Sequence, residues 1–133
     1  MIKFYYQKGN RKGGLRDPMV IKYKDRTAEE QFSSKYKKRW QYPEAVKTRL
    51  VATENYIDQA DSLLDIVQYP SYRFHPLRGD RKGEWSISLG KTGYRVTVIP
   101  CDEHGKQILS GDIVAQCKSI RIIEVTEVSN HYE

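Results

Sequence analysis

The feature that most constrains the fold is a change in the spacing of apolar residues part-way along the chain. Between residues 43 and 64, a stripe of apolar and small side chains recurs about every 3.6 residues, which is the repeat of an amphipathic helix. Its members are Val46, Leu50, Thr53, Ile57, Ala60 and Leu64. From residue 72 the repeat becomes two, which is that of a β-strand. Helices followed by strands predict an α+β domain, with the helices packed on one face of a small, mainly antiparallel sheet.

Four runs of residues predict the main strands of this sheet. Three alternating runs span residues 72–77, 84–89 and 94–99, and a fourth, IRIIEVTEV, spans 120–128 after a less regular loop at about 101–118. The side chains expected to face the core are Tyr72, Phe74, Trp85, Ile87, Tyr94, Val96 and Val98. The connections GDRKG and GKTG are short and contain glycine, so they favour antiparallel neighbours. Residues 19–24, MVIKYK, predict an edge strand that precedes the helices.

Capping residues predict where the helices begin. Thr27 and Glu30 have the spacing of a capping box, so a short helix is expected over residues 28–37 with Phe32 facing inward. Pro43 suits the first position of a second helix, over residues 43–60. A further turn, SLLDIV, is expected to be capped by Ser62 and to end before a proline.

The length of 133 residues suits one domain. We expect residues 19–133 to form it, with residues 1–18 as a basic N-terminal extension. No apolar run is long enough to span a bilayer, and the start does not have the pattern of a signal peptide, so we expect a cytoplasmic protein without a membrane partner. Cys101 and Cys117 have neither CxxC spacing nor a nearby histidine set, so they are expected to be free thiols, with no metal and no cofactor.

The positive charge is concentrated in two parts of the chain. The net charge is +6, and residues 1–24 hold seven Lys or Arg and one Asp, which accounts for all of the excess. Residues 69–95 hold six basic and two acidic side chains, whereas residues 96–133 hold three basic and six acidic. A positive surface attracts polyanions, nucleic acid above all. The alternative is that these charges only keep the protein in solution.

The strand repeat places two residues with useful chemistry on the face opposite the core. If Tyr94 and Val96 face the helices, Arg95 faces the other way, and the same reasoning puts His75 opposite Phe74. Four further cations are expected around them, and together they would form a basic surface that can meet a polyanion such as RNA. They are Arg73, Arg78, Arg81 and Lys82.

Such a face could bind a phosphodiester or cleave one. Cleavage of RNA needs a base for the 2′-hydroxyl proton, a cation for the phosphate and an acid for the departing 5′-oxygen. An imidazole such as His75 suits proton transfer, and the guanidinium of Arg95 suits the phosphate. Near the C-terminus, His131 could titrate and Tyr132 could donate a proton or stack on a base. The alternative is that His75 is only a hydrogen-bonded surface residue and that the last residues fray.

One segment resembles a known family of toxins. The order VIKYKDRTAEEQF, then DQADSLLDIVQYPSYRFHPLRGDRKGEWSISL, then GYRVTV is similar to that in the HigB toxins of the RelE/ParE superfamily. The resemblance covers residues 19–100, and its most specific part is HPLRGDRKGEWSI. It implies a microbial-ribonuclease-like α+β fold and a type II toxin that cuts messenger RNA in the ribosomal A site without a metal.

The resemblance also carries expectations about partners and residues. It implies a HigA-like helix-turn-helix antitoxin as a protein partner, with DNA bound only through that antitoxin. It places Arg95 at the scissile phosphate. It also places His75, with Arg78, Arg81 and Lys82, in the basic segment that faces RNA and the ribosome. One departure concerns the tail, because many members end in an Asp-Tyr-His type of sequence whereas this chain ends in Asn-His-Tyr-Glu. Tyr132 then matches the family tyrosine, but the assignment of acid and base stays open.

Two other functions compete with the ribosome-dependent endoribonuclease. One is a non-catalytic inhibitor of DNA gyrase, as in the ParE branch of the superfamily. The other is a simple RNA-binding module that stacks bases on aromatic rings. The titratable His75 favours cleavage over inhibition, and the core parity of most strand aromatics disfavours the stacking module.

Overall fold

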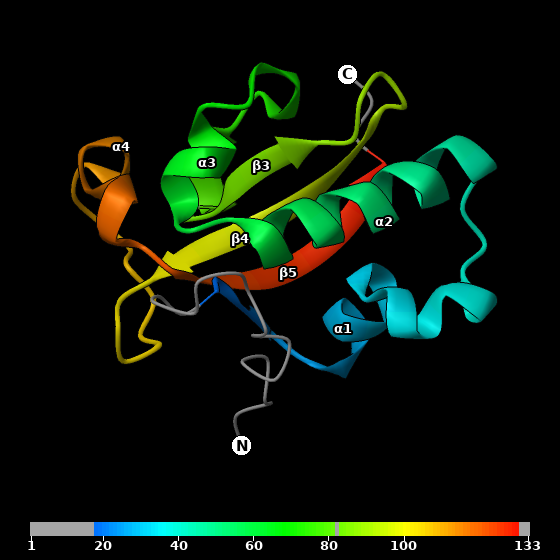
Figure 1. Ribbon diagram of the computed structural model, residues 1–133, viewed down its shortest axis with the longest axis horizontal. Coiled ribbons are helices and arrows are strands. Elements are labelled where there is room, and N and C mark those ends of the chain that lie inside the picture. The colour runs from blue at the N-terminus through cyan, green and yellow to red at the C-terminus, as the bar shows by residue number, and fades with distance from the viewer. Residues whose placement is uncertain (1–17, 82, 131–133) are drawn as a thin grey trace.

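The computed structural model describes residues 18–81 and 83–130, which form a five-stranded sheet with helices (Figure 1). The order across the sheet is β1-β5-β4-β3-β2. The strands are β1 (Val20–Tyr23), β2 (His75–Pro76), β3 (Trp85–Ser88), β4 (Tyr94–Cys101) and β5 (Ile122–Asn130). Only β1 runs parallel to its neighbour, β5, and the other three pairs are antiparallel. The predicted sheet, mainly antiparallel with the first strand at an edge, is confirmed.

The helices precede most of the sheet in the chain. The α-helices are α1 (Arg26–Phe32), α2 (Glu44–Gln59), α3 (Leu63–Val67) and α4 (Ile113–Gln116). The 3₁₀ helices are η2 (Ser34–Arg39), η3 (Pro70–Tyr72), η4 (Gly79–Arg81) and η5 (Cys117–Ser119). In Figure 1, α2 and α3 lie across one face of the sheet, while α1 and α4 lie towards opposite ends. The α+β class is therefore confirmed.

The core lies between α2 and the sheet, as the periodicity predicted. Val46, Leu50, Thr53 and Ile57 of α2 are all buried, and they recur at intervals of three and four residues, so one stripe of the helix faces inward. Ile87, Val96 and Val98 of the sheet are fully buried in the same apolar cluster. Burying each such aliphatic side chain contributes about 1.5–3 kcal/mol. This layer fixes which side of β3 and β4 remains available for polar residues.

The predicted start and length of the first helix were wrong. The N-cap is Asp25, whose carboxylate accepts a hydrogen bond from the Ala28 amide at 2.9 Å, and not Thr27. The helix ends at Phe32 because Ser33 is extended (φ −75°, ψ 129°), and its hydroxyl caps the following η2. Two short helices thus replace the one expected over residues 28–37. The inward position of Phe32 is confirmed, and so is the cap of α3 by Ser62.

The strand expected over residues 72–77 was also largely wrong. Residues 70–72 form η3, and Arg73 has a left-handed backbone (φ 45°), so the alternation begins only at β2, which is two residues long. The physical reason is aromatic packing: the ring of Tyr72 lies 4.6 Å from that of Tyr69 and 5.5 Å from that of Tyr56. A strand through Tyr72 would break this cluster.

The segment after β4 folds back onto the end of that strand. Ile108 donates its amide to the Pro100 carbonyl at 2.9 Å, and Ile113 is buried. Cys101 and Cys117 are both free and buried, as predicted. Burial raises the pKa of the Cys101 thiol to about 11, so it stays protonated at neutral pH and acts as a packing residue.

Across the described ranges, none of the helices combines the length and the apolar character that crossing a bilayer requires.

Candidate active site

The face of the sheet opposite α2 carries two rows of polar residues. Directly paired residues on neighbouring strands share a face. His75 pairs with Ser86, Ser86 with Thr97 and Thr97 with Glu127. The next row joins Ser88 to Arg95 and Arg95 to Ser129. The sheet therefore brings His75 and Arg95 to the same face, and the strand spacings put their Cα atoms about 12 Å apart.

The side chain of Arg95 contains a buried polar atom whose hydrogen-bonding capacity is unused within the described part of the chain. Its Nε atom is buried and has no hydrogen-bond partner among the described residues. An N–H group left buried without an acceptor costs about 1–3 kcal/mol. Its cross-strand neighbours, Ser88 and Ser129, are short hydroxyl residues, which leave space beside a longer side chain. The Arg95 guanidinium is thus suited to donate hydrogen bonds to an external oxyanion such as a phosphate.

His75 is exposed and has a defined ring orientation. Its Nδ1 lies 2.6 Å from the carbonyl oxygen of Arg73. Since a carbonyl only accepts, Nδ1 carries the proton of the neutral ring, and Nε2 keeps its lone pair. Arg73 presents this carbonyl from its left-handed backbone (φ 45°), a conformation that costs a non-glycine residue about 1–2 kcal/mol. Strained residues of this kind cluster at functional sites. In the His75 ring, the lone pair on Nε2 is the position that can accept a proton.

A bulge in β5 brings two consecutive polar side chains to this face. Thr97 pairs with Glu127 but Val98 pairs with Val125, so Thr126 is the extra residue. A bulge re-aims side chains and is common next to active sites. The Thr126 hydroxyl lies 2.7 Å from that of Thr97 and 3.1 Å from Oε1 of Glu84. The bulge thereby connects β5 to the turn that precedes β3.

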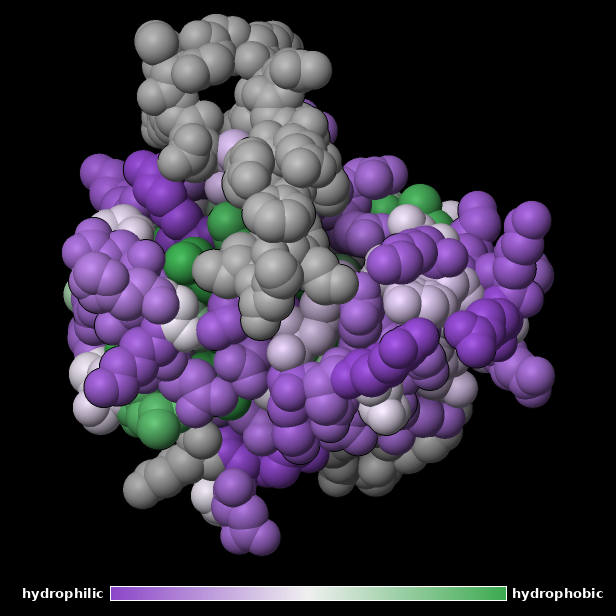
Figure 2. Space-filling model, turned by 90° about the horizontal axis from the view of Figure 1, so that it is seen from below, coloured by the Kyte–Doolittle hydropathy of each residue, from purple (hydrophilic) through white to green (hydrophobic). Residues whose placement is uncertain are grey.

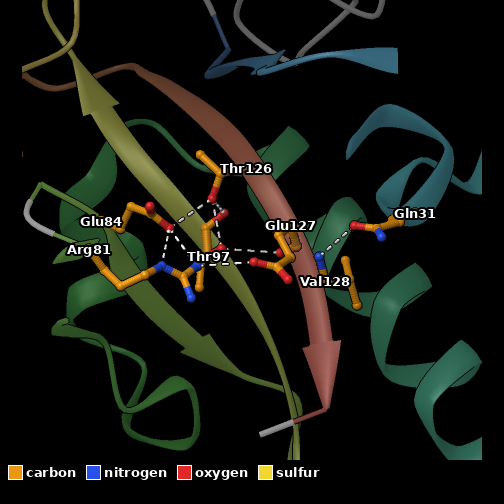
Figure 3. A network of polar contacts seen from close by, with 7 residues as sticks. All are labelled: Gln31, Arg81, Glu84, Thr97, Thr126, Glu127 and Val128. Atoms are coloured by element: carbon orange, nitrogen blue, oxygen red, sulfur yellow. Dashed lines mark hydrogen bonds and ion pairs between the residues drawn. The ribbon is translucent and has the colours of Figure 1, made fainter. Parts of the chain in front are cut away.

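Arg81 and two carboxylates complete this group (Figure 3). We call it the bulge network, and its members are Arg81, Glu84, Thr97, Thr126 and Glu127. Arg81 Nη2 lies 2.8 Å from Glu84 Oε1 and 3.1 Å from Glu127 Oε1. Partial burial raises the pKa of Glu84, but hydrogen bonding and charge from Arg81, with the hydrogen bond from Thr126, outweigh it. The net result is a lowered pKa, so Glu84 is ionised at neutral pH. The hydrogen bond that Arg81 donates to Glu84, together with the negative charges of Glu84 and Glu127, raises the pKa of Arg81.

The candidate face is consequently less positive than the sequence implied. The charge of Arg81, predicted to contact RNA, is shared between two carboxylates, whereas Arg73 and Arg78 are exposed. Arg95 and His75 are the two predicted catalytic residues that the sheet brings to one face. Lys82, His131 and Tyr132 lie outside the described residues, as does nearly all of the proposed extension, residues 1–17.

Sequence reasoning missed Thr126 and Glu127 as members of this face. The buried apolar residues of β5 are Ile123, Val125 and Val128, and the step from 125 to 128 is three rather than two. That break in a period-two pattern signals a bulge, and it could have placed both polar residues beside Thr97.

Within residues 18–81 and 83–130, no three His, Cys, Asp or Glu side chains come together in an arrangement that could hold a metal ion. In comparisons with known proteins, no family model matches the chain, and no curated protein gives a significant match.

Proposed function

We propose that this protein is a HigB-type toxin of the RelE/ParE superfamily, a ribosome-dependent endoribonuclease that cuts messenger RNA and so stops translation. The observation that carries this function is the buried, unpartnered Nε of Arg95 on the face that also presents His75. A phosphodiester on this face would accept hydrogen bonds from the guanidinium of Arg95, whose buried Nε has no partner among the described residues. The similarity of residues 19–100 to the family gives the reaction class.

In this mechanism the 2′-oxygen of the RNA attacks the adjacent phosphorus, and the bond to the 5′-oxygen breaks. The products are a 2′,3′-cyclic phosphate and a 5′-hydroxyl. Arg95 donates hydrogen bonds to the charged phosphate oxygens as they gain charge in the transition state. We assign Nε2 of His75 as the acceptor of the 2′-hydroxyl proton, since Nδ1 lies at the Arg73 carbonyl. The 5′-oxygen takes its proton from the C-terminal residues, with His131 and Tyr132 as the candidates.

The partners follow from the same family. The substrate is messenger RNA presented in the ribosomal A site, and a HigA-like helix-turn-helix protein neutralises the toxin. The second predicted function, inhibition of DNA gyrase, needs no titratable group on the sheet. It is therefore kept as an outcome of the experiment rather than as a parallel proposal.

The function is tested by expressing the chain and its Arg95→Ala variant in bacteria and mapping the 5′ ends of messages by primer extension. New ends within translated codons are expected for the parent chain. In the variant, cleavage is expected to fall about 100-fold or more, as for removal of one donor to a transition-state oxyanion. Lys106→Ala, which removes an exposed cation from the loop after β4, is the matched control and is expected to cleave normally.

Two results would contradict the function. Growth arrest with DNA damage and intact messages would indicate gyrase inhibition. Binding to RNA with no new 5′ ends in either protein would leave only a binding module.

Thermal unfolding of Arg95→Ala identifies a trivial loss of structure, and Arg95→Lys shows whether a positive charge alone is sufficient.

A further inference from the structure

The 3₁₀ helix η2 presents four exposed cations within six residues. Its sequence is SKYKKR, and Lys35, Lys37, Lys38 and Arg39 are all exposed. A 3₁₀ helix has three residues per turn, so side chains three apart lie on one edge. Lys35 is therefore aligned with Lys38, and Tyr36 with Arg39. Lys37 lies on the third edge, so the segment displays its charge along all three edges.

Most of this charge is not neutralised locally. Lys35 lies 3.7 Å from Glu29, a long ion pair between partly exposed groups. Lys37, Lys38 and Arg39 form no ion pair with any carboxylate in the described part of the chain. Exposed ion pairs contribute little even where they form. The field of η2 therefore extends into solvent.

An open groove of about 600 Å³ lies between η2 and the outer side of α2. Lys37 and Lys38 line it from η2 and Lys47 from α2. Its one carboxylate belongs to Glu44, which is 88% exposed and lies 3.4 Å from Lys47. Three cations thus surround a groove with one acid at its rim, and this arrangement attracts an extended anion.

A second groove, of about 380 Å³, lies on the other side of η2 and includes Tyr36 and Arg39. Two cations flank the Tyr36 ring: Lys35 Nζ is 5.4 Å and the Arg39 guanidinium 5.7 Å from its centroid. Arginine and tyrosine together suit a nucleic-acid chain, because both can lie against a base or a sugar while the cations reach the phosphates.

We propose that η2 and the adjoining side of α2 form a second nucleic-acid surface, which holds a phosphodiester backbone by charge and independently of sequence. Figure 2 shows strongly hydrophilic side chains projecting at the right of the molecule, the end at which Figure 1 places η2 and the start of α2. The surface belongs to different elements from the cleavage site on the sheet. The ring of Tyr42, 5.7 Å from that of Tyr94, connects the two regions.

A nucleic acid fits this surface better than a protein partner does. Val51 and Ala52 are the aliphatic residues that line the larger groove, whereas a stable protein interface has a buried apolar centre and about 800 Å² on each partner. Binding to a phosphate backbone needs no such centre, because release of counterions supplies the affinity. The excess of lysines and the lack of an apolar centre in the larger groove both favour a nucleic-acid phosphate backbone over a protein as the partner.

The experiment measures binding of fluorescent RNA and DNA hairpins by anisotropy over a range of salt concentrations. The full chain carrying Arg95→Ala serves as the parent, so that cleavage does not interfere. Lys37→Gln/Lys38→Gln is compared with Lys106→Gln/Lys118→Gln, which removes the same charge from exposed lysines in other elements, the loop after β4 and η5. Each lysine lost from a phosphate contact is expected to lower the slope of log K against log salt by about 1. The η2 variant should therefore bind about tenfold more weakly or worse near 0.1 M salt.

The outcomes separate this surface from the proposed cleavage. Equal losses for RNA and DNA assign the binding to phosphate, and a larger loss for RNA assigns it to the A-form backbone. Equal effects of the two double variants, or none from either, overturn the second surface. So does lysine-dependent binding of a polyglutamate peptide without binding of either hairpin, since that would indicate an acidic protein partner. Messages that stay uncut in cells would refute the cleavage and leave this binding result unchanged.

Discussion

Two basic segments of this chain, residues 72–95 and η2, have similar charge but differ in what the fold does with it. In the first, Arg81 lies between Glu84 and Glu127, and Arg95 is partly buried beside serines. In η2, four cations project from a short helix, and one of them contacts a carboxylate at 3.7 Å. In the first segment two of the cations are packed among polar partners or neighbours, whereas the second segment is an open surface.

The number of basic residues in a segment is therefore a poor guide to where the surface is positive. The ion pairs that those residues form in the folded protein are a better guide. The basic count drew attention to residues 69–95, where carboxylates from the turn and from β5 cancel part of the charge. Glu127 is 46 residues away from Arg81 in the chain, so no local window could register that pairing. The net field at a surface depends on which charges the fold brings together.

The largest effect on stability is expected from Arg81→Ala. Removing this guanidinium leaves two carboxylates close together, one of them on Glu84, whose side chain is only 19% exposed. We expect a loss of about 2 kcal/mol, between the values for surface and buried pairs. Arg78→Ala is the matched control, since Arg78 is exposed, and should change stability by less than about 0.5 kcal/mol. Urea unfolding measures both, and equal losses would mean that the bulge network adds nothing.

A smaller, pH-dependent effect is expected from Glu84→Gln. Because the pKa of Glu84 is lowered in the folded protein, ionised Glu84 stabilises the fold above its unfolded pKa of about 4.3. That contribution disappears as the pH falls through the folded value. Glutamine keeps an acceptor for Thr126 but has no charge, so the variant should be about 1 kcal/mol less stable at pH 7. Urea unfolding at pH 7 and near pH 3 measures the gap, which should close in acid; a constant gap would contradict the ionic contribution.

The smallest effect on stability is expected for the exposed lysines of η2. Lys37→Gln/Lys38→Gln should change the free energy of unfolding by less than about 0.5 kcal/mol, because exposed lysines without partners contribute little to the fold. Removing two like charges can even stabilise η2 slightly. Thermal unfolding at low salt is the measurement. A loss as large as that of Arg81→Ala would show that η2 is built into the fold and would erase the contrast between the two segments.

Much of the fold was predictable because it depends on local periodicity. The stripe of α2 and the strands β3, β4 and β5 follow from spacing that any short window contains. Two local errors arose from competing interactions. Asp25 is two residues ahead of the predicted cap and is also a strong capping residue, and aromatic packing of Tyr72 overrode the alternation that followed it.

The site was predictable only where it depended on strand parity. Arg95 shares a face with Thr97 because the two residues lie two apart on β4, and that parity is a sequence property. His75 comes to the same face because it pairs with Ser86, which pairs with Thr97. The contacts of Arg81 depend on a bulge and on Glu127 of a distant strand. Such contacts are set by tertiary register, so no argument from residues 72–95 alone could have placed them.

The way the sheet ends at its two sides has a consequence for the behaviour of the protein at high concentration. The outer strands β1 and β2 have four and two residues, and β5 extends beyond Val125, where its pairing with β1 stops. There the amide of Val128 donates to Oε1 of Gln31 at 2.9 Å, so a side chain of α1 occupies a hydrogen bond that a foreign strand would need. Long open edges are templates for aggregation. In this molecule the outer strands are short, and the Gln31 side chain occupies a backbone amide of β5. Little strand edge is therefore left with which a neighbouring copy could pair.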